Sequence, residues 1–216
     1  ANSNNSNWSS YFWKVRFYLW SASGFCSIGP LLFLLYINDI QESSDKLNFY
    51  LFADDTNILF ADKNLKSLEL YINQELNKVY DWLTANKLTL NIKKSNFVMF
   101  CPAQRKLSYQ PKIVIFDNKQ NKKVALEHKD YVKYLGILID KNLSWKRHID
   151  HIIIKVSRTV GLIAKLRHFL LTHTLLNIYQ ALMAPYLTYG LAVWGQAWKS
   201  YLDKLLKLQK RAVRFI

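Results

Sequence analysis

Hydrophobic residues recur along this 216-residue chain with two different periods. In the stretch from 65 to 86 they return every three or four positions, at Leu65, Leu68, Ile72, Leu76, Val79 and Leu83. An α-helix has 3.6 residues per turn, so this spacing predicts an amphipathic helix with one apolar face.

Shorter apolar segments on either side of this helix favour strands. Phe49 to Ala53 and Asn57 to Phe60 flank Asp54-Asp55, which predicts two antiparallel strands joined by a tight acidic turn. Further strands are predicted over 88–92, 97–100, 113–116, 122–126 and 131–140, the third and fourth as a hairpin. Gly29-Pro30 introduces LLFLLYINDI, which predicts a buried helix ending near Asn38 or Asp39.

After residue 140 the period is helical to the end of the chain. The apolar stripes are Ile149, Ile152, Val156, Val160 and Ile163; Leu175, Ile178 and Leu182; and Leu202, Leu205, Gln209 and Ala212. The predicted fold class is therefore α+β: an antiparallel sheet with packed helices, followed by an all-helical lobe. The corresponding regions are an irregular tail over 1–22, a sheet domain over 23–140 and helices over 141–216.

The positive charge of the chain is concentrated in its last third. The chain has 30 Lys and Arg against 15 Asp and Glu, a net charge of +15. Residues 141–216 hold 13 of these bases and two acids, Asp150 and Asp203, so 13 − 2 = +11 lies there. This excess favours nucleic acid as the partner. A membrane is disfavoured because the bases are dispersed, no lipidation motif occurs and the longest strongly apolar run, 31–37, is far too short to span a bilayer.

The cysteines and histidines do not form a metal-binding pattern. Cys26 and Cys101 have no CxxC neighbour and no His at ligand spacing, which predicts free thiols in a reducing, intracellular compartment, nucleus or cytoplasm. His148 and His151 are three residues apart, but no third ligand is near.

Asp54-Asp55 is the main candidate for chemistry. Two adjacent carboxylates repel each other unless a cation offsets them. Mg²⁺ prefers such hard oxygen ligands and leaves positions free for phosphate oxygens. The alternative is an ordinary acidic turn, since Asp is common in turns.

Several ordered motifs resemble the reverse transcriptases of non-LTR retrotransposons, the LINE, jockey and RTE-like elements. Phe52-Ala53-Asp54-Asp55 is similar to their YADD box, with Phe for Tyr, and GPLLFLLYINDI, residues 29–40, is almost the family's string after its Gly-Ser turn. LN-x-x-K-[TS]-x-x-M-x-F is matched from Leu90 to Phe100 except at its Met position, where Val98 stands and Met99 follows. Tyr134-Leu135-Gly136 and residues 208–212, LQKRA, match blocks further downstream. The resemblance covers residues 24 to 216.

This resemblance implies RNA-directed DNA synthesis with Mg²⁺, with Mn²⁺ as the alternative, on an RNA template, a DNA primer and a dNTP. Residues 23–140 would be a partial polymerase palm and 141–216 a thumb-like lobe. Asp54 and Asp55 would bind metal, and Lys94 would act as general acid near the pyrophosphate. Gly136 would mark a strand bend near the primer terminus. Lys94 could equally be a solvated lysine at a strand end, and Gly136 a structural glycine.

Bases in the helical region are the expected contacts to nucleic acid, and nothing in the sequence indicates an oligomer. They are Lys146, Arg147, Lys155, Arg158, Lys165, Arg167, Lys207, Lys210, Arg211 and Arg214.

The chain also departs from the family's pattern. The family's first catalytic Asp lies upstream in a block like F-x-D-x-x-x-A-F-D, but no Asp precedes Asp39 here. Residues 23–28 replace the family's PQGS turn, and no fingers region is present. We therefore expect a truncated or decayed copy that does not polymerise unaided, with an exposed acidic turn and an unpaired sheet edge. The alternative is a non-catalytic nucleic-acid-binding remnant.

Overall fold

The computed structural model describes residues 9–16, 28–53, 55–62, 64–102, 104, 109–117 and 122–216. The chain divides into two compact units, Ala1–Val132 and Lys133–Ile216. The sequence pattern predicted that the sheet domain ends, and the helical region begins, after Asp140. The structural division comes earlier because the strand ending at Asp140 packs on the first long helix of the second unit.

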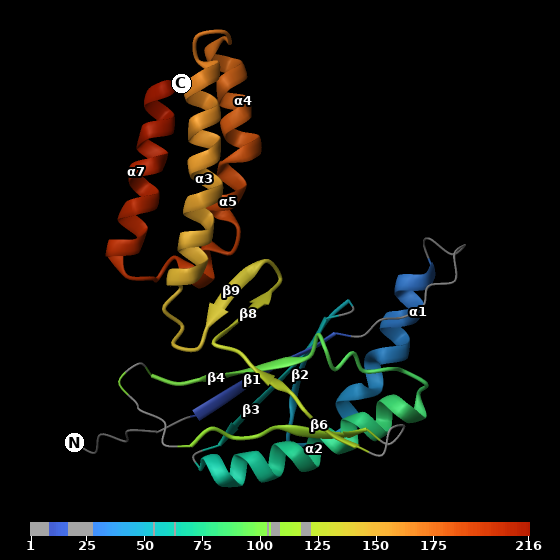
Figure 1. The fold of residues 1–216 in the computed structure, drawn as a ribbon. Coiled ribbons are helices and arrows are strands. Elements are labelled where there is room, and N and C mark those ends of the chain that lie inside the picture. Colours follow the sequence, from blue (N-terminus) through green and yellow to red (C-terminus); the bar gives the residue numbers. More distant parts are fainter. Residues whose placement is uncertain are drawn as a thin grey trace, which may run out of the picture. The chain divides into compact units, whose positions relative to one another are not determined.

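The first unit is built on a five-stranded sheet (Figure 1). Its strands are β1 (Ser9–Arg16), β2 (Asn48–Phe52), β3 (Asp55–Asp62), β4 (Asn96–Phe100) and β7 (Glu127–His128), in the order β2-β3-β1-β4-β7. Neighbours are antiparallel except for β4 and β7. Helix α1 (Ile28–Ile37) follows β1, and α2 (Leu65–Ala85) follows β3. The first six of these elements therefore form a βαββαβ motif.

Strand β1 corrects two expectations. The predicted irregular tail over 1–22 is wrong for Ser9–Arg16, which forms the central strand of the sheet. Trp13 and Val15 belong to the residue types that favour strands. The predicted unpaired edge is also wrong, because β1 pairs with β3 from Ser9↔Asp62 to Arg16↔Asp55.

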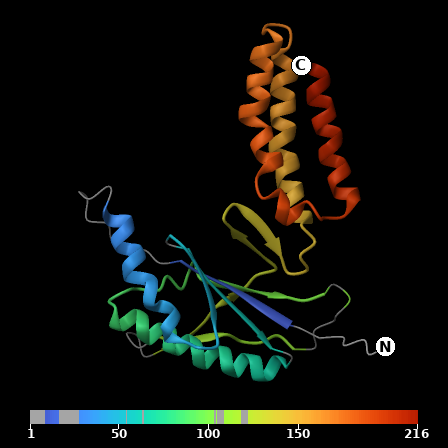
Figure 2. The ribbon, with the colours of Figure 1, turned by 180° about the vertical axis from the view of Figure 1, so that it is seen from behind.

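Helix α2 covers one face of this sheet, in both Figure 1 and Figure 2. The prediction of this helix is confirmed. Asn64 caps it, since its side chain accepts a hydrogen bond from the backbone N–H of Lys66 at 3.0 Å. The core on this side consists of the buried residues Leu68, Ile72, Leu76 and Val79 of α2 with Ile58, Phe97 and Met99 of the sheet.

Two other predictions for this unit are corrected. Helix α1 and the 3-10 helix that follows it, Asn38–Ser43, form where a helix was expected, but α1 is not buried. Ile37 is buried, while Leu31, Leu32, Leu34 and Leu35 are each at least 50% exposed. Residues 88–92 contain an isolated bridge at Leu90 rather than a strand, although Leu88 and Leu90 are buried as expected.

The predicted hairpin beyond β4 is confirmed as β5 (Val114–Asp117) and β6 (Lys122–Ala125). Asparagine side chains of α2 bind its backbone. Asn73 accepts the N–H of Val114 at 2.8 Å, and Asn77 accepts the N–H of Phe116 at 3.1 Å. These hydrogen bonds join the hairpin to the helix.

Residues 131–140 form a hairpin, not the single strand predicted there. It consists of β8 (Tyr131–Tyr134) and β9 (Ile137–Asp140). Leu135 and Gly136 form the turn with φ of 45° and 84°. The left-handed region suits glycine, so Gly136 is required at this position by the turn itself.

Five helices follow this hairpin. They are α3 (Lys146–Leu166), α4 (Thr172–Leu182), α5 (Ala184–Thr188), α6 (Leu191–Trp194) and α7 (Lys199–Phe215). Figures 1 and 2 both show α3 between α4 and α7. The predicted stripe of α3 is buried throughout, as are Leu205 and Ala212 of α7, whereas Leu182 is 44% exposed. No helix in the described part of the chain is long and apolar enough to cross a membrane.

Candidate functional site

The acidic turn lies where the sequence predicted it. Strands β2 and β3 are antiparallel, and Phe52 pairs with Asp55, so a two-residue loop connects them. Ala53, the first loop residue, has φ of 49°. Left-handed φ is typical of such tight hairpin turns. Asp54, the second loop residue, lies outside the described residues.

Asp55 is the first residue of β3, and it is buried. Its exposed fraction is 7%, so the expectation of an exposed acidic pair is wrong for this residue. A buried carboxylate is costly unless a counter-charge or hydrogen bonds stabilise it. The register places Arg16 of β1 directly opposite Asp55.

A two-metal polymerase site needs carboxylates from more than one strand. Strand β1, with the sequence SSYFWKVR, is the neighbour of β3 and contains none. Among the described residues, which leave out Asp54, no group of three or more His, Cys, Asp or Glu could hold a metal ion. The described residues therefore do not by themselves form a two-metal site.

Lys94 lies near the same end of the sheet as the acidic turn. Strands β3 and β4 are both antiparallel to β1, so their first residues, Asp55 and Asn96, lie at the same end. Lys94 precedes Asn96 by two residues in an exposed turn. Two strand spacings separate β3 from β4, about 10 Å. Strand β1 lies between them.

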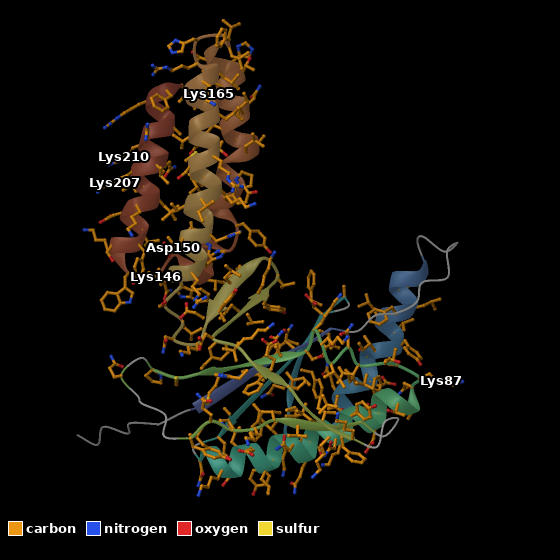
Figure 3. All side chains as sticks on the ribbon, in the orientation of Figure 1. Lys87, Lys146, Asp150, Lys165, Lys207 and Lys210 are labelled. Atoms are coloured by element: carbon orange, nitrogen blue, oxygen red, sulfur yellow. The ribbon has the colours of Figure 1, made fainter. Side chains whose placement is uncertain are left out.

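The predicted basic contacts lie along α3 and α7 and are mostly exposed. Four of them line one hollow of about 440 Å³ near the C-terminal end of α7, together with Phe215: Lys207, Lys210, Arg211 and Arg214. In Figure 3, Lys207 and Lys210 project from α7 on the side away from α3. None of the described residues that line this hollow is acidic. Its charge and shape suit a polyanion.

An aromatic ring holds two of the guanidinium groups together. Arg167, just after α3, lies 5.0 Å from the centre of the Phe215 ring, and Arg211 lies 5.6 Å from it. Cations at such distances are attracted by the ring face. Part of this charge also offsets the negative C-terminal ends of α3 and α7, which is a structural role. The positive charge of the cluster is nevertheless larger than the partial negative charge of the two helix ends.

The remaining predicted contacts are not gathered at this hollow. Gly136 lies in the β8–β9 turn, and Lys155 is half-buried in the middle of α3. The others are exposed residues of α3: Lys146, Arg147, Arg158 and Lys165. The sequence analysis missed Lys133, Tyr186 and Tyr189, which share a cleft with Lys155 and the two histidines of α3. No short motif marks these residues, because they come from separate elements.

Comparison with known proteins gives a family and several relatives. The profile of the family described as reverse transcriptase (RNA-dependent DNA polymerase) matches residues 22–139, more than half of the chain. The RNA-directed DNA polymerase from mobile element jockey of Drosophila melanogaster is 30% identical over 200 residues. The probable RNA-directed DNA polymerase from transposon X-element of the same species is 26% identical over 197 residues.

These matches cover 88% of this chain and 21% of each relative, so the chain spans about a fifth of their length. The jockey polymerase of Drosophila funebris is 24% identical over 200 residues, with the same coverage. No solved structure gives a significant match.

Proposed function

This chain belongs to the reverse transcriptase (RNA-dependent DNA polymerase) family, and we propose that it holds template and primer through its helical unit without copying them unaided. Residues 23–140 would correspond to a palm and 141–216 to a thumb-like lobe. RNA template and DNA primer are the proposed partners. The observation that carries the nucleic-acid role is the hollow of α7, where four bases gather with no acid among them.

The proposal that this chain does not polymerise unaided rests on which strands of the sheet contribute carboxylates. Asp54 and Asp55 remain the proposed ligands for Mg²⁺ or Mn²⁺, and Lys94 the proposed general acid. The central strand between β3 and β4, however, places Arg16 opposite Asp55 and contributes no carboxylate. Loss of one metal bridge would remove several kcal/mol of transition-state stabilisation, and each 1.36 kcal/mol is about tenfold in rate.

Primer extension tests this part of the proposal. A labelled DNA primer on an RNA template would be incubated with the chain, dNTPs and either Mg²⁺ or Mn²⁺. We expect no extension above the background without protein, at either metal. Extension by the original chain that disappears in Asp54→Ala and Asp55→Ala, while Asp62→Ala at the other end of β3 keeps it, would overturn the proposal.

A non-catalytic nucleic-acid-binding module is the second candidate function. The sequence of β1 favours it, because this neighbour of β3 contributes no carboxylate to a two-metal site. The two candidates differ in metal dependence. If Mn²⁺ binds to the free chain with micromolar affinity and Asp55→Asn abolishes that binding, the metal-binding candidate is favoured over the module.

A further inference from the structure

The second unit contains a cleft of about 520 Å³ between the β8–β9 turn and helices α3, α4 and α5. Its volume is within the range of sites that hold small molecules, roughly 300–1,000 Å³. No acidic residue lines it. Its polar and aromatic lining is formed by Lys133, His148, His151, Lys155, Tyr186 and Tyr189. This lining combines positive charge with aromatic rings.

Tyr189 is held in place at this cleft. Its hydroxyl donates a hydrogen bond to the carbonyl oxygen of Leu135 at 2.6 Å, and its own carbonyl oxygen accepts one from Trp194 Nε1 at 2.9 Å. The ring lies against Gly136, where an added Cβ would come within 3.4 Å of it. Tyr189 is nevertheless 56% exposed. A fixed ring with an accessible surface loses little entropy when a ligand packs on it.

His148 has an unused hydrogen-bond donor in the wall of the cleft. It is 3% exposed, and its Nδ1 accepts the backbone N–H of Leu138 at 3.3 Å. Neutral imidazole therefore carries its hydrogen on Nε2. Burial, and next the neighbouring His151, lower the pKa of His148, which favours this neutral form. Among the described residues Nε2 has no partner, and an unpaired buried donor is costly.

We propose that this cleft binds one unpaired nucleotide of a nucleic-acid strand. Lys133 and Lys155 would contact the phosphate. The base would stack on Tyr186, beside the fixed ring of Tyr189, which requires a base that is not enclosed in a duplex. The proposal rests on the nucleic-acid role proposed above, but it concerns a site separate from the hollow of α7, with which it shares no residue.

Fluorescence anisotropy with the whole chain tests the proposal, using a labelled single-stranded decamer as RNA and as DNA, and a blunt duplex. Tyr186→Leu keeps an apolar side chain but removes the aromatic face, and should weaken single-strand binding about tenfold. Lys155→Gln should weaken it about fivefold. Lys199→Gln, an exposed position at the start of α7 that lines neither site, should change it less than about twofold. The tighter of the RNA and DNA arms identifies the strand.

Tyr186→Phe separates stacking from a folding defect, because it keeps the ring. It should bind single strands within about twofold of the original chain. Duplex binding should change less than about twofold in Tyr186→Leu. Equal losses on duplex and single strands, or losses no larger than that of Lys199→Gln, would overturn the cleft proposal alone. Failure of the original chain to bind any of the three probes would overturn the proposed nucleic-acid role as well.

Discussion

At the scale of single residues, two features determine the local geometry of the first unit: the backbone conformation of the acidic turn and the hydrogen bonds of one buried carboxylate. Ala53 adopts φ of 49° in the turn, a region that costs a residue with a Cβ about 1–2 kcal/mol. Glu75 of α2 is 3% exposed and binds Ser44 Oγ at 2.7 Å and Lys78 Nζ at 3.0 Å. Neither feature was predicted, because backbone strain and long-range polar contacts leave no local pattern in the sequence.

Ala53→Gly should stabilise the first unit. Glycine removes the left-handed strain, but it also has more freedom in the unfolded chain, so the net gain should be about 0.5–1 kcal/mol. Urea unfolding measures this change through its midpoint. Ala125→Gly, in β6 where φ is not positive, is the matched control and should give no gain. A lower midpoint for Ala53→Gly would contradict the turn geometry.

Glu75→Gln should lower the free energy of unfolding by about 1–3 kcal/mol, because it weakens charged hydrogen bonds in a buried site. Burial by itself raises the pKa of Glu75, but the hydrogen bonds from Ser44 and Lys78 outweigh it and the pKa is lowered. The stabilisation is therefore present at neutral pH and is lost as the pH falls below the ordinary value of 4.5 towards the folded pKa. Urea unfolding at pH 7 and pH 4 measures both effects.

The matched control for Glu75 is Glu127→Gln. Glu127 is in a surface ion pair with Lys129 at 3.2 Å, and its side chain is 65% exposed. Surface pairs contribute little. If both variants lose the same stability, or if Glu75→Gln keeps the full acid sensitivity of the original chain, the assignment of this effect to Glu75 is wrong.

At the scale of elements, long amphipathic helices were predictable and the pairing of short strands was not. The stripes of α2 and α3 are buried as expected, since each contains enough helical turns for the period to be unambiguous. Strand β1 was missed because its central place depends on partners far away in the chain, Asp55–Asp62 and Asn96–Phe100. The same limit applies to the site: the sequence located the acidic turn, but not the basic position opposite it.

The side chain of Asp140 organises the segment that leads into helix α3. Its carboxylate accepts hydrogen bonds from the backbone N–H groups of Asn142, Ser144 and Trp145 at 3.1, 3.0 and 2.8 Å, and from Ser144 Oγ at 3.2 Å. These bonds shape the segment that leads into α3, whose N-cap residue is Trp145. The carboxylate also lies near the positive end of the helix.

Asp140→Ala should therefore destabilise the second unit by about 2–3 kcal/mol. Hydrogen exchange should show the loss of protection concentrated in the first turns of α3. Asp203→Ala, in α7 where no cap is formed, should change stability by less than about 0.5 kcal/mol. Unchanged exchange in α3 of Asp140→Ala would show that another group starts this helix.

At the scale of the whole molecule, the two units differ in how their charged residues are arranged. The sheet unit holds an acidic turn opposite a basic strand position, whereas the helical unit gathers exposed bases with few acids. The charge imbalance could be predicted from the sequence, and so could the two helices, α3 and α7, on which most of it lies. Its concentration around Phe215 was not readable, because Arg167 and Arg211 meet there only through the packing of α3 on α7.

The central claim is that this chain holds nucleic acid through the bases of its helical unit, and the salt dependence of binding to an RNA–DNA template–primer tests it most directly. Contact with about five phosphates predicts that log K falls against log salt with a slope near −4 or −5. Replacing Lys207, Lys210, Arg211 and Arg214 together by Gln should reduce the magnitude of this slope by about three. A slope near zero, or the same slope in the fourfold variant, would contradict the account.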